Sequence, residues 1–400
     1  MKVLHVIPWV SLKRGGPSQE ILQLVPAQNQ LGIQSEIITT NDDGPGLLDV
    51  PLGDVTEYRG APVRFFPRWS PKSSALREFV YCAPLAGWLS AHAHEYDLLH
   101  VHGIFNYVST AGMRIARRQR KPYLNRPHGM LCEWSLRRSA LRKKIYLALT
   151  ERANLNGSLG LTCTAEQEIE EARLVHLRPP SIVLPCGLHL PPFVPNARDR
   201  LREKYSLPQD RPIILFLSRL HPKKGLDLLL DALETMTDVD FTFIAAGSGE
   251  PDYEKALRAR VQTGPLAGRI LMPGFAEGAD KDLLLQGADI FALTSHSESF
   301  AIAVLEAMAV GLPAVISSTI PLASIVTKHG LGVVTNLEPS QIAAALRAQL
   351  KKPRDEARAT HSRDLVQRNF TWDIIARRSL EVYEAALQKK PLPSWELAAV

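Results

Sequence analysis

The sequence has little cysteine and no hydrophobic run long enough to cross a bilayer. Its 400 residues include four cysteines, and no pair has the CxxC spacing of a zinc or redox motif: Cys82, Cys132, Cys163 and Cys186. We therefore predict buried thiols in a reducing compartment instead of a disulfide framework. The longest nearly uncharged stretch, residues 300–316, contains Glu306 and a Gly-Leu-Pro break, which excludes a transmembrane helix there.

Other common signatures are also missing. The opening run MKVLHVIPWV lacks the long apolar region and the small-residue cleavage site of a signal peptide, so we predict a cytoplasmic protein. Gly15 and Gly16 follow this run and can let the backbone approach a phosphate, although a simple turn explains them equally well. The pair matches neither GxGxxG nor a Walker A loop, which argues against a dinucleotide or ATP site.

The chain does carry a basic excess, with a formal net charge of +6. Such an excess suits an anionic partner such as phosphate, nucleic acid or a membrane surface. The basic residues concentrate in two groups: Arg114, Arg117, Arg118, Arg120 and Lys121, and then Arg137, Arg138, Arg142, Lys143 and Lys144.

Apolar residues interleave with the second basic group, at Leu136, Leu141, Ile145 and Leu149. This pattern is compatible with docking on anionic lipid head groups and equally with a solvated helix face packed on the core. Nucleic acid is disfavoured as the partner, because no aromatic platform or known reader motif accompanies the charge.

The length and the order of elements predict two domains. Strand candidates of the first half occupy 3–8, 34–39, 62–66, 98–102, 123–127 and 159–163, and amphipathic helices predicted over 18–30, 74–94, 109–119 and 140–154 lie between them. After a Pro-rich stretch at 178–195, strand candidates resume at 213–218, 241–246, 270–272, 290–293 and 314–317. This alternation predicts an α/β fold with two Rossmann-like, doubly wound domains, residues 1–190 and 196–370. Ligands in such sheets bind at the carboxyl ends of the strands.

The sharpest chemical signal is SESFAIAVLEAMAVGLP at 297–313, which follows a strand and enters a helix. Glu298 and Glu306 lie slightly over two helical turns apart, and their carboxylates suit the vicinal hydroxyls of a sugar and a ribose. The amides of Ser299, Phe300 and Ala301 precede the helix, where N–H groups point toward an anion. Alternatively, Glu298 only complements the helix dipole and Glu306 is solvated. The apolar helix around Glu306 argues against that alternative.

A second signal is LSRLHPKKG at 217–225, which follows the strand IILFLS. Arg219 and Lys224 there would form a clamp for a diphosphate, and the alternative is an ordinary basic surface loop. Two further loops follow strands and fit a nucleotide pocket. AGSGE offers a flexible backbone at Gly247, and PGF offers Gly274 and the ring of Phe275.

Histidines mark strand ends in the first half. His128, in NRPHGM, could donate a hydrogen bond to a sugar hydroxyl. His100 and His102 share one face of a strand in the manner of a metal pair. The sequence shows no third ligand, so buried packing is favoured.

With these motifs in this order, the chain resembles the family-four retaining glycosyltransferases (glycosyl transferases group 1) of GT-B fold. The residues that carry the resemblance are Glu298-x7-Glu306 with its AMAVGLP continuation, LSRLHPKKG, GSGE, PHG and the Gly15-Gly16 pair. It implies an interdomain cleft, no bound metal or other cofactor, and a final helix, within 372–390, that crosses back onto the N-terminal domain.

The resemblance also implies roles. Glu298 and the amides of 299–301 would bind the donor sugar, and Glu306 would hold the ribose. Arg219 and Lys224 would neutralise the diphosphate leaving group, Gly16 would close over it, and His128 would touch the transferred sugar. The chain departs from the family at Ala301, where glycine is usual, and at Cys186 and His189, which replace Asn and Asp.

The resemblance implies transfer of a sugar from a nucleotide-diphosphate sugar to a lipid-linked or polysaccharide acceptor, which would take place at the inner face of the membrane. Because the first half shows no glycosidase-like carboxylate pair, we expect same-face attack with retention of configuration. The alternatives are a nucleotide-sugar epimerase, a sugar-phosphate synthase, or a catalytically silent sugar-nucleotide-binding protein.

Overall fold

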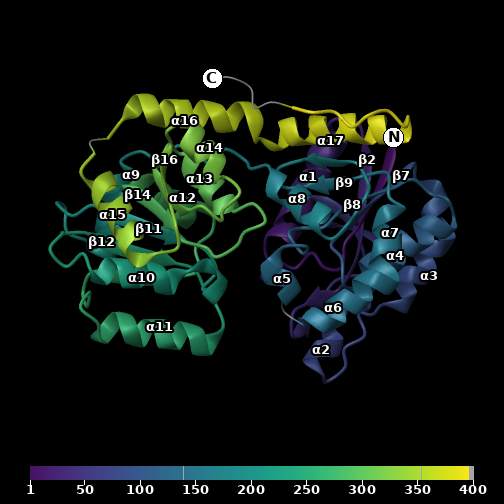
Figure 1. Ribbon diagram of the computed structural model, residues 1–400, viewed down its shortest axis with the longest axis horizontal. Coiled ribbons are helices and arrows are strands. Elements are labelled where there is room, and N and C mark those ends of the chain that lie inside the picture. Colours follow the sequence, from purple (N-terminus) through teal and green to yellow (C-terminus); the bar gives the residue numbers. More distant parts are fainter. Residues whose placement is uncertain (138, 353, 396–400) are drawn as a thin grey trace. The chain divides into compact units, whose positions relative to one another are not determined.

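A computed structural model describes residues 1–137, 139–352 and 354–395, so Arg138 of the second basic group lies outside the described residues. The chain forms two compact units (Figure 1). Unit 1 is Met1–Gly187 together with the chain from Trp372, and unit 2 is Leu188–Thr371. The division at Gly187 falls within the Pro-rich stretch. Within the described residues, every helix is too short or too polar to cross a bilayer.

Unit 1 contains an eight-stranded sheet in the order β10-β9-β8-β7-β1-β2-β6-β5. Its strands are β1 (Lys2–Val6), β2 (Gln34–Thr40), β5 (Val55–Tyr58), β6 (Ala61–Phe66), β7 (Leu98–His102), β8 (Tyr123–Arg126), β9 (Leu161–Cys163) and β10 (Ser181–Val183). All pairs are parallel except β5 with β6. A separate hairpin joins β3 (Asp42–Asp43) and β4 (Gly46–Leu47).

The helices of unit 1 are α1 (Gly16–Gln30), α2 (Ser74–Arg77), α3 (Ala83–His92), α4 (Tyr107–Arg118), α5 (Glu133–Arg137), α6 (Ala140–Tyr146), α7 (Arg152–Asn156) and α8 (Glu166–Leu174). Short 3-10 turns η1 (Leu12–Arg14) and η2 (Ala93–Glu95) and a π-helical turn η3 (Leu147–Glu151) complete it. The helix predicted over 74–94 is interrupted before α3, where Pro84 lies in the first turn and cannot continue a preceding helix.

Unit 2 contains a six-stranded, wholly parallel sheet in the order β13-β12-β11-β14-β15-β16. Its strands are β11 (Ile213–Leu217), β12 (Thr242–Ala246), β13 (Ile270–Gly274), β14 (Ile290–Leu293), β15 (Ala314–Ser317) and β16 (Gly332–Thr335). Numbered within the unit, this is the order 3-2-1-4-5-6 of a doubly wound Rossmann fold. The predicted fold class is therefore confirmed.

The helices of unit 2 are α9 (Ala197–Tyr205), α10 (Leu226–Glu234), α11 (Pro251–Thr263), α12 (Gly278–Gly287), α13 (Ile302–Ala309), α14 (Ala323–Lys328), α15 (Pro339–Leu350) and α16 (Glu356–Asn369), with a 3-10 turn η4 (Pro222–Lys224). The central strands, IILFL in β11 and IFAL in β14, are buried along their whole length. Continuous apolar runs of this kind are typical of parallel strands that helices cover on both faces.

The final helix, α17 (Trp372–Leu387), belongs to unit 1 although unit 2 precedes it in the sequence. Its Trp372, Ile375 and Ala376 pack in one apolar cluster with side chains of α1. Farther along, Val382, Tyr383 and Ala386 pack with residues of β1 and β7. Figure 1 shows α17 in yellow beside α1, from the other end of the chain. The predicted return of this helix to the N-terminal domain is confirmed.

Close packing against Trp372 gives a test of how α17 docks. A Cβ atom on Gly187 would lie 2.7 Å from Cδ2 of the Trp372 indole, closer than carbon atoms approach. We expect Gly187→Ala to lower the free energy of unfolding of unit 1 by about 1–3 kcal/mol, as overpacked core substitutions do. Urea unfolding measures the change.

Gly87→Ala is the matched control in the same unit. Gly87 lies within α3 with nothing within 4 Å of its added Cβ, so alanine should stabilise the unit by about 0.5–1 kcal/mol. Equal stability of Gly187→Ala and the natural protein would contradict the tight docking of α17.

Candidate active site

The sheet of unit 2 reverses its strand order between β11 and β14. These two strands pair in parallel, with Ile214 opposite Ile290, so their carboxyl ends reach the same edge of the sheet. The chain leaves β11 toward β12 and leaves β14 toward β15, on opposite sides. Such a reversal is where doubly wound proteins bind ligands. The two strongest sequence motifs follow these two strands.

Lys224 and Glu298 meet at this edge. The Lys224 Nζ atom lies 2.6 Å and 2.8 Å from the two carboxylate oxygens of Glu298. The hydroxyl of Ser295 donates to the same carboxylate at 2.6 Å. Both charged side chains are mostly shielded from solvent. The structure therefore brings together the predicted cation and the predicted sugar-binding acid, from loops 74 residues apart.

Backbone contacts hold the two loops in register. The amide of His296 donates to the Lys223 carbonyl at 2.8 Å, and the Thr294 hydroxyl donates to the Gly225 carbonyl at 2.7 Å. Gly225 has a left-handed φ of 66°, and a Cβ atom there would lie 1.9 Å from the Thr294 carbonyl oxygen. Glycine after Lys224 is thus required for the approach of the two loops.

Glu306, on α13, also has a partner. The Nζ atom of Lys281, from α12, lies 2.6 Å from its carboxylate, and both side chains are partly shielded. The partner that an acid on an apolar helix requires is therefore present. Lys281 was not predicted as this partner, because it lies 25 residues away on another helix.

The segment between Glu298 and α13 has a strained backbone. Ala301 caps the helix at φ 71° and ψ 66°, in the left-handed region that favours glycine. This conformation accounts physically for glycine being usual at this position. The ring of Phe300 is buried and lies 6.3 Å from the ring of Phe370. Ser299 is half-buried.

The loops after β11, β12 and β13 pack closely together. Leu220 donates its amide to the Ser248 carbonyl at 2.8 Å, and Gly247 donates to the Gly274 carbonyl at 2.7 Å. A Cβ atom on Gly247 would lie 1.8 Å from the Ser218 carbonyl oxygen. Glycine at this position is therefore needed for the close approach of the two loops, and the flexible backbone expected there stays a prediction.

Two predicted side chains at this edge remain accessible. Arg219 is exposed and forms no ion pair with any residue that the structure describes. Phe275, directly after β13, is 68% exposed. Together with the Lys224–Glu298 pair, they place two cations, an acid and an aromatic ring on loops at the carboxyl edge of one sheet.

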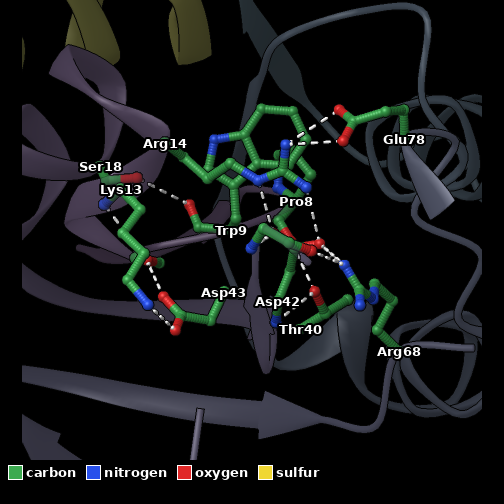
Figure 2. A network of polar contacts seen from close by, with 12 residues as sticks. Pro8, Trp9, Lys13, Arg14, Ser18, Thr40, Asp42, Asp43, Arg68 and Glu78 are labelled. Atoms are coloured by element: carbon green, nitrogen blue, oxygen red, sulfur yellow. Dashed lines mark hydrogen bonds and ion pairs between the residues drawn. The ribbon is translucent and has the colours of Figure 1, made fainter. Parts of the chain in front are cut away.

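The remaining predicted residues lie in unit 1, where the Gly15–Gly16 turn follows β1. Gly15 adopts φ 94° and Gly16 begins α1. The basic residues before the turn are held by acids of the β3 hairpin (Figure 2). Lys13 Nζ lies 2.6 Å from Asp43, and Arg14 makes two hydrogen bonds to Asp42, at 2.6 Å and 2.9 Å.

Further contacts complete this network. Arg14 also pairs with Glu78 at 2.9 Å and stacks over the Trp9 ring, and the fully buried Arg68 pairs with the fully buried Asp42. The charges in KRGG thus fix the turn. Asp42 and Asp43 were not predicted from the sequence, because the residues around Lys13 and Arg14 do not show which acids of another element will pair with them.

His128 follows β8 in another strained turn, with φ 56°, and Gly129 continues it with φ 69°. Its ring points inward and its side chain is only 3% exposed. The Nε2 atom lies 3.0 Å from His102 Nδ1. Burial lowers the pKa of His128 well below its usual value, so the ring is neutral at physiological pH.

A third histidine joins the His100–His102 pair. His5, from β1, lies opposite His100, and ligand atoms of the three rings lie within 4.8 Å of one another. The sequence did not show this third member, because β1 and β7 are neighbours only in the folded sheet. Burial lowers the pKa of His5 to about 4, and the pKa values of His100 and His102 also fall well below the usual value.

Comparisons with known proteins agree with this division of the chain. Residues 15–187 match the model of the glycosyl transferase 4-like domain, and residues 197–363 match the model of glycosyl transferases group 1. A D-inositol 3-phosphate glycosyltransferase from Xylanimonas cellulosilytica is 29% identical over 398 residues, spanning 94% of this chain and 93% of its own. A GDP-mannose:cellobiosyl-diphosphopolyprenol alpha-mannosyltransferase from Komagataeibacter xylinus is 26% identical, spanning 100% of this chain and 96% of its own.

Solved structures share the fold. Sucrose-phosphate synthase from Thermosynechococcus elongatus superposes with a TM-score of 0.77 at 20% identity, covering 98% of this chain and 100% of its own. HepE from Anabaena, solved in complex with UDP and glucose, gives 0.74 at 22% identity, covering 96% and 100%. Because family models match both halves in this order, on the two doubly wound sheets described above, the chain belongs to the glycosyl transferases of group 1 and is a glycosyltransferase.

Proposed function

We propose that this protein is a retaining glycosyltransferase that uses a nucleotide-diphosphate sugar and passes the sugar to a lipid-linked or polysaccharide acceptor. The observation that carries the proposal is the contact of Lys224 with Glu298 at the carboxyl ends of β11 and β14. This contact supports the proposal, because the cation would meet the diphosphate and the acid would meet the hydroxyls of one donor at this edge of the sheet.

When the donor binds, Lys224 and Glu298 would separate, and each would contact the donor instead. Lys224 would turn from Glu298 to the diphosphate, joined by the exposed Arg219, and Glu298 would accept hydrogen bonds from sugar hydroxyls. The amides of residues 299–301, before α13, would donate to donor oxygens. Glu306, oriented by Lys281, would accept from the ribose hydroxyls, and Phe275 would lie against the base.

The reaction breaks the bond between the anomeric carbon and the diphosphate oxygen and forms a bond from that carbon to the acceptor oxygen. Negative charge accumulates on the leaving diphosphate, and preplaced cations lower the barrier by electrostatic preorganisation. We propose that the leaving phosphate oxygen takes the acceptor proton on the same face of the sugar, so that configuration is retained. The positive charge is assigned to Arg219 and Lys224 and not to a metal ion or other cofactor.

The acceptor side of the proposal draws on a relative. The Komagataeibacter xylinus protein, whose name gives a cellobiosyl-diphosphopolyprenol acceptor, matches this chain along its whole length. A polyprenol diphosphate is anionic and lies in a membrane. We therefore propose that this protein works at the cytoplasmic surface of a bilayer with such an acceptor. The roles of Gly15 and Gly16 toward the diphosphate and of His128 toward the transferred sugar stay predictions.

A surface of unit 1 fits that location. Leu141, Ile145 and Leu149 follow one another at helical spacing through α6 and η3, and Leu141 and Leu149 are 73% and 78% exposed. Arg142 and Lys144 beside them are exposed as well. An exposed apolar stripe flanked by cations matches the interface of an anionic bilayer, where the leucines enter the acyl boundary and the cations meet head groups.

Replacing the proposed leaving-group cation tests the catalytic assignment. We expect Lys224→Met to lower kcat about 10²–10³-fold, as the loss of one preorganised electrostatic group does. The assay should contain excess EDTA and should follow transfer to a lipid-linked acceptor, with a parallel reaction that lacks the acceptor. Formation of an epimer from the donor alone would favour the epimerase alternative.

Lys255→Met is the control, because Lys255 is an exposed cation on α11 of the same unit. It should keep the natural rate. Unchanged transfer by folded Lys224→Met would refute the role of Lys224.

Donor binding tests Glu306 separately. Glu306→Gln removes the charge that accepts from the ribose, so we expect the affinity for nucleoside diphosphate to fall about tenfold. A thermal-shift series with UDP, GDP and ADP measures this and identifies the nucleotide. Glu203→Gln, an exposed acid on α9, should bind as the natural protein does. If the two variants bound equally well, the ribose role would be wrong.

Vesicle binding tests the proposed membrane surface. We expect Leu141→Ser with Leu149→Ser to weaken binding to phosphatidylglycerol vesicles at least about tenfold, since each buried leucine contributes about 1.5–3 kcal/mol. Binding of the natural protein should weaken with salt and on pure phosphatidylcholine. Leu174→Ser is the control, because Leu174 is also 78% exposed but lies on α8. If the double variant bound as tightly as the control, this surface would not be the docking site.

A further inference from the structure

A chain of three histidines runs through the core of unit 1 and ends at the turn after β8. His5 Nδ1 lies 3.0 Å from His102 Nε2, and His102 Nδ1 lies 3.0 Å from His128 Nε2. The far end is anchored by Gln28 of α1, whose Oε1 lies 2.9 Å from His5 Nε2. His5, His102 and Gln28 are buried.

Contacts with α17 determine which nitrogen donates and which accepts in each hydrogen bond of this histidine chain. The hydroxyl of Ser379 donates to the backbone carbonyl of Ala376 at 2.7 Å, and a carbonyl can only accept. Ser379 has one hydroxyl proton, so its oxygen must accept from the side-chain NH₂ of Gln28, 2.9 Å away. The amide of Gln28 is therefore oriented with its oxygen toward His5.

The orientation of Gln28 fixes each ring in turn. A neutral imidazole donates through one nitrogen and accepts through the other. His5 must donate from Nε2 to Gln28, so its Nδ1 accepts from His102 Nε2. His102 Nδ1 then accepts from His128 Nε2, which leaves a lone pair on Nδ1 of His128. Burial lowers the pKa of all three rings, which keeps them neutral.

Two of these residues, His5 and His102, form a candidate metal cluster with His100. Every ring nitrogen in it already has a hydrogen-bond partner. His100 Nδ1 lies 2.8 Å from the hydroxyl of Tyr383, and its Nε2 lies 2.9 Å from the hydroxyl of Thr162. The hydrogen bonds therefore account for the cluster without an ion.

We propose that Gln28, His5 and His102 are positioning residues that hold His128 as the Nε2–H tautomer, so that its Nδ1 accepts a hydrogen bond from a substrate hydroxyl. This inference rests on the proposed function for its substrate and reverses the donor role that the sequence suggested for His128. The ring is a neutral acceptor instead of a donor.

The surroundings of His128 favour a hydroxyl over a phosphate. Its Nδ1 lies 3.7 Å from Oε2 of Glu20, whose other oxygen pairs with Arg126 at 2.7 Å. Two neighbouring acceptors attract a group that donates hydrogen bonds and disfavour phosphate oxygens, which only accept. The amide of Gly129 donates to Glu168, which holds the turn in place. This site is thereby distinct in chemistry from the cations of unit 2.

Nitrogen NMR of the natural protein tests the tautomer without any activity assay. In ¹⁵N-histidine-labelled protein near neutral pH, long-range ¹H–¹⁵N correlations distinguish the two neutral tautomers from the imidazolium. We expect Nε2–H patterns for His5, His102 and His128. An Nδ1–H pattern or an imidazolium pattern at His128 would overturn the proposal, whether or not transfer is detected.

A variant at the far end tests the coupling. Gln28→Met removes the anchor at similar length, so we expect His128 to show mixed tautomers and kcat/KM for transfer to fall about tenfold, the value of one hydrogen bond. Binding of nucleoside diphosphate, assigned to unit 2, should not change. Thr162→Val is the control, because Thr162 contacts His100, which is not one of the residues that link Gln28 to His128. An unchanged His128 tautomer in folded Gln28→Met would show that the chain does not act as proposed.

Discussion

Both units depend on one constraint, the parallel pairing of two central strands from which the chain leaves in opposite directions. In unit 1 these strands are β1 and β7, and in unit 2 they are β11 and β14. The pairing brings residues that are distant in the sequence to one edge of a sheet. The contact of Lys224 with Glu298 and the contact of His5 with His102 both follow from it. In unit 2 the contact is charged and mostly shielded from solvent, whereas in unit 1 it is neutral and fully buried.

Most of the fold could be predicted from the sequence, because parallel strands covered on both faces are continuous apolar runs. The strands from β1 to β15 that lie inside the sheets were found in this way. The edge strand β5, with the half-exposed sequence VTEY, and the hairpin of β3 and β4 carry no such run, and neither was predicted. The prediction of a single helix over 74–94 was also wrong, because the helix is interrupted before α3, whose first turn contains Pro84.

The candidate site divides in the same way. Lys224, Glu298 and Glu306 were found because each lies in a motif next to a strand end. Lys281, His5 and Asp42 were not found, because each acts through a partner on another element, and only the folded chain shows which residues meet. The close packing at Gly247 was not predicted for a related reason. Glycine can serve close packing or backbone freedom, and the sequence does not tell the two apart.

The position of α17 has a consequence for synthesis on the ribosome. Its side chains complete two apolar clusters of unit 1, yet it is made after all of unit 2. Domains generally fold as units in the order of their synthesis. Here the first unit stays incomplete, with an open apolar face on α1, until the second has been translated. The Ala376 carbonyl, which orients Gln28 through Ser379, is also synthesised only then, so the hydrogen-bonding pattern of His5 in the first strand depends on one of the last helices to be made.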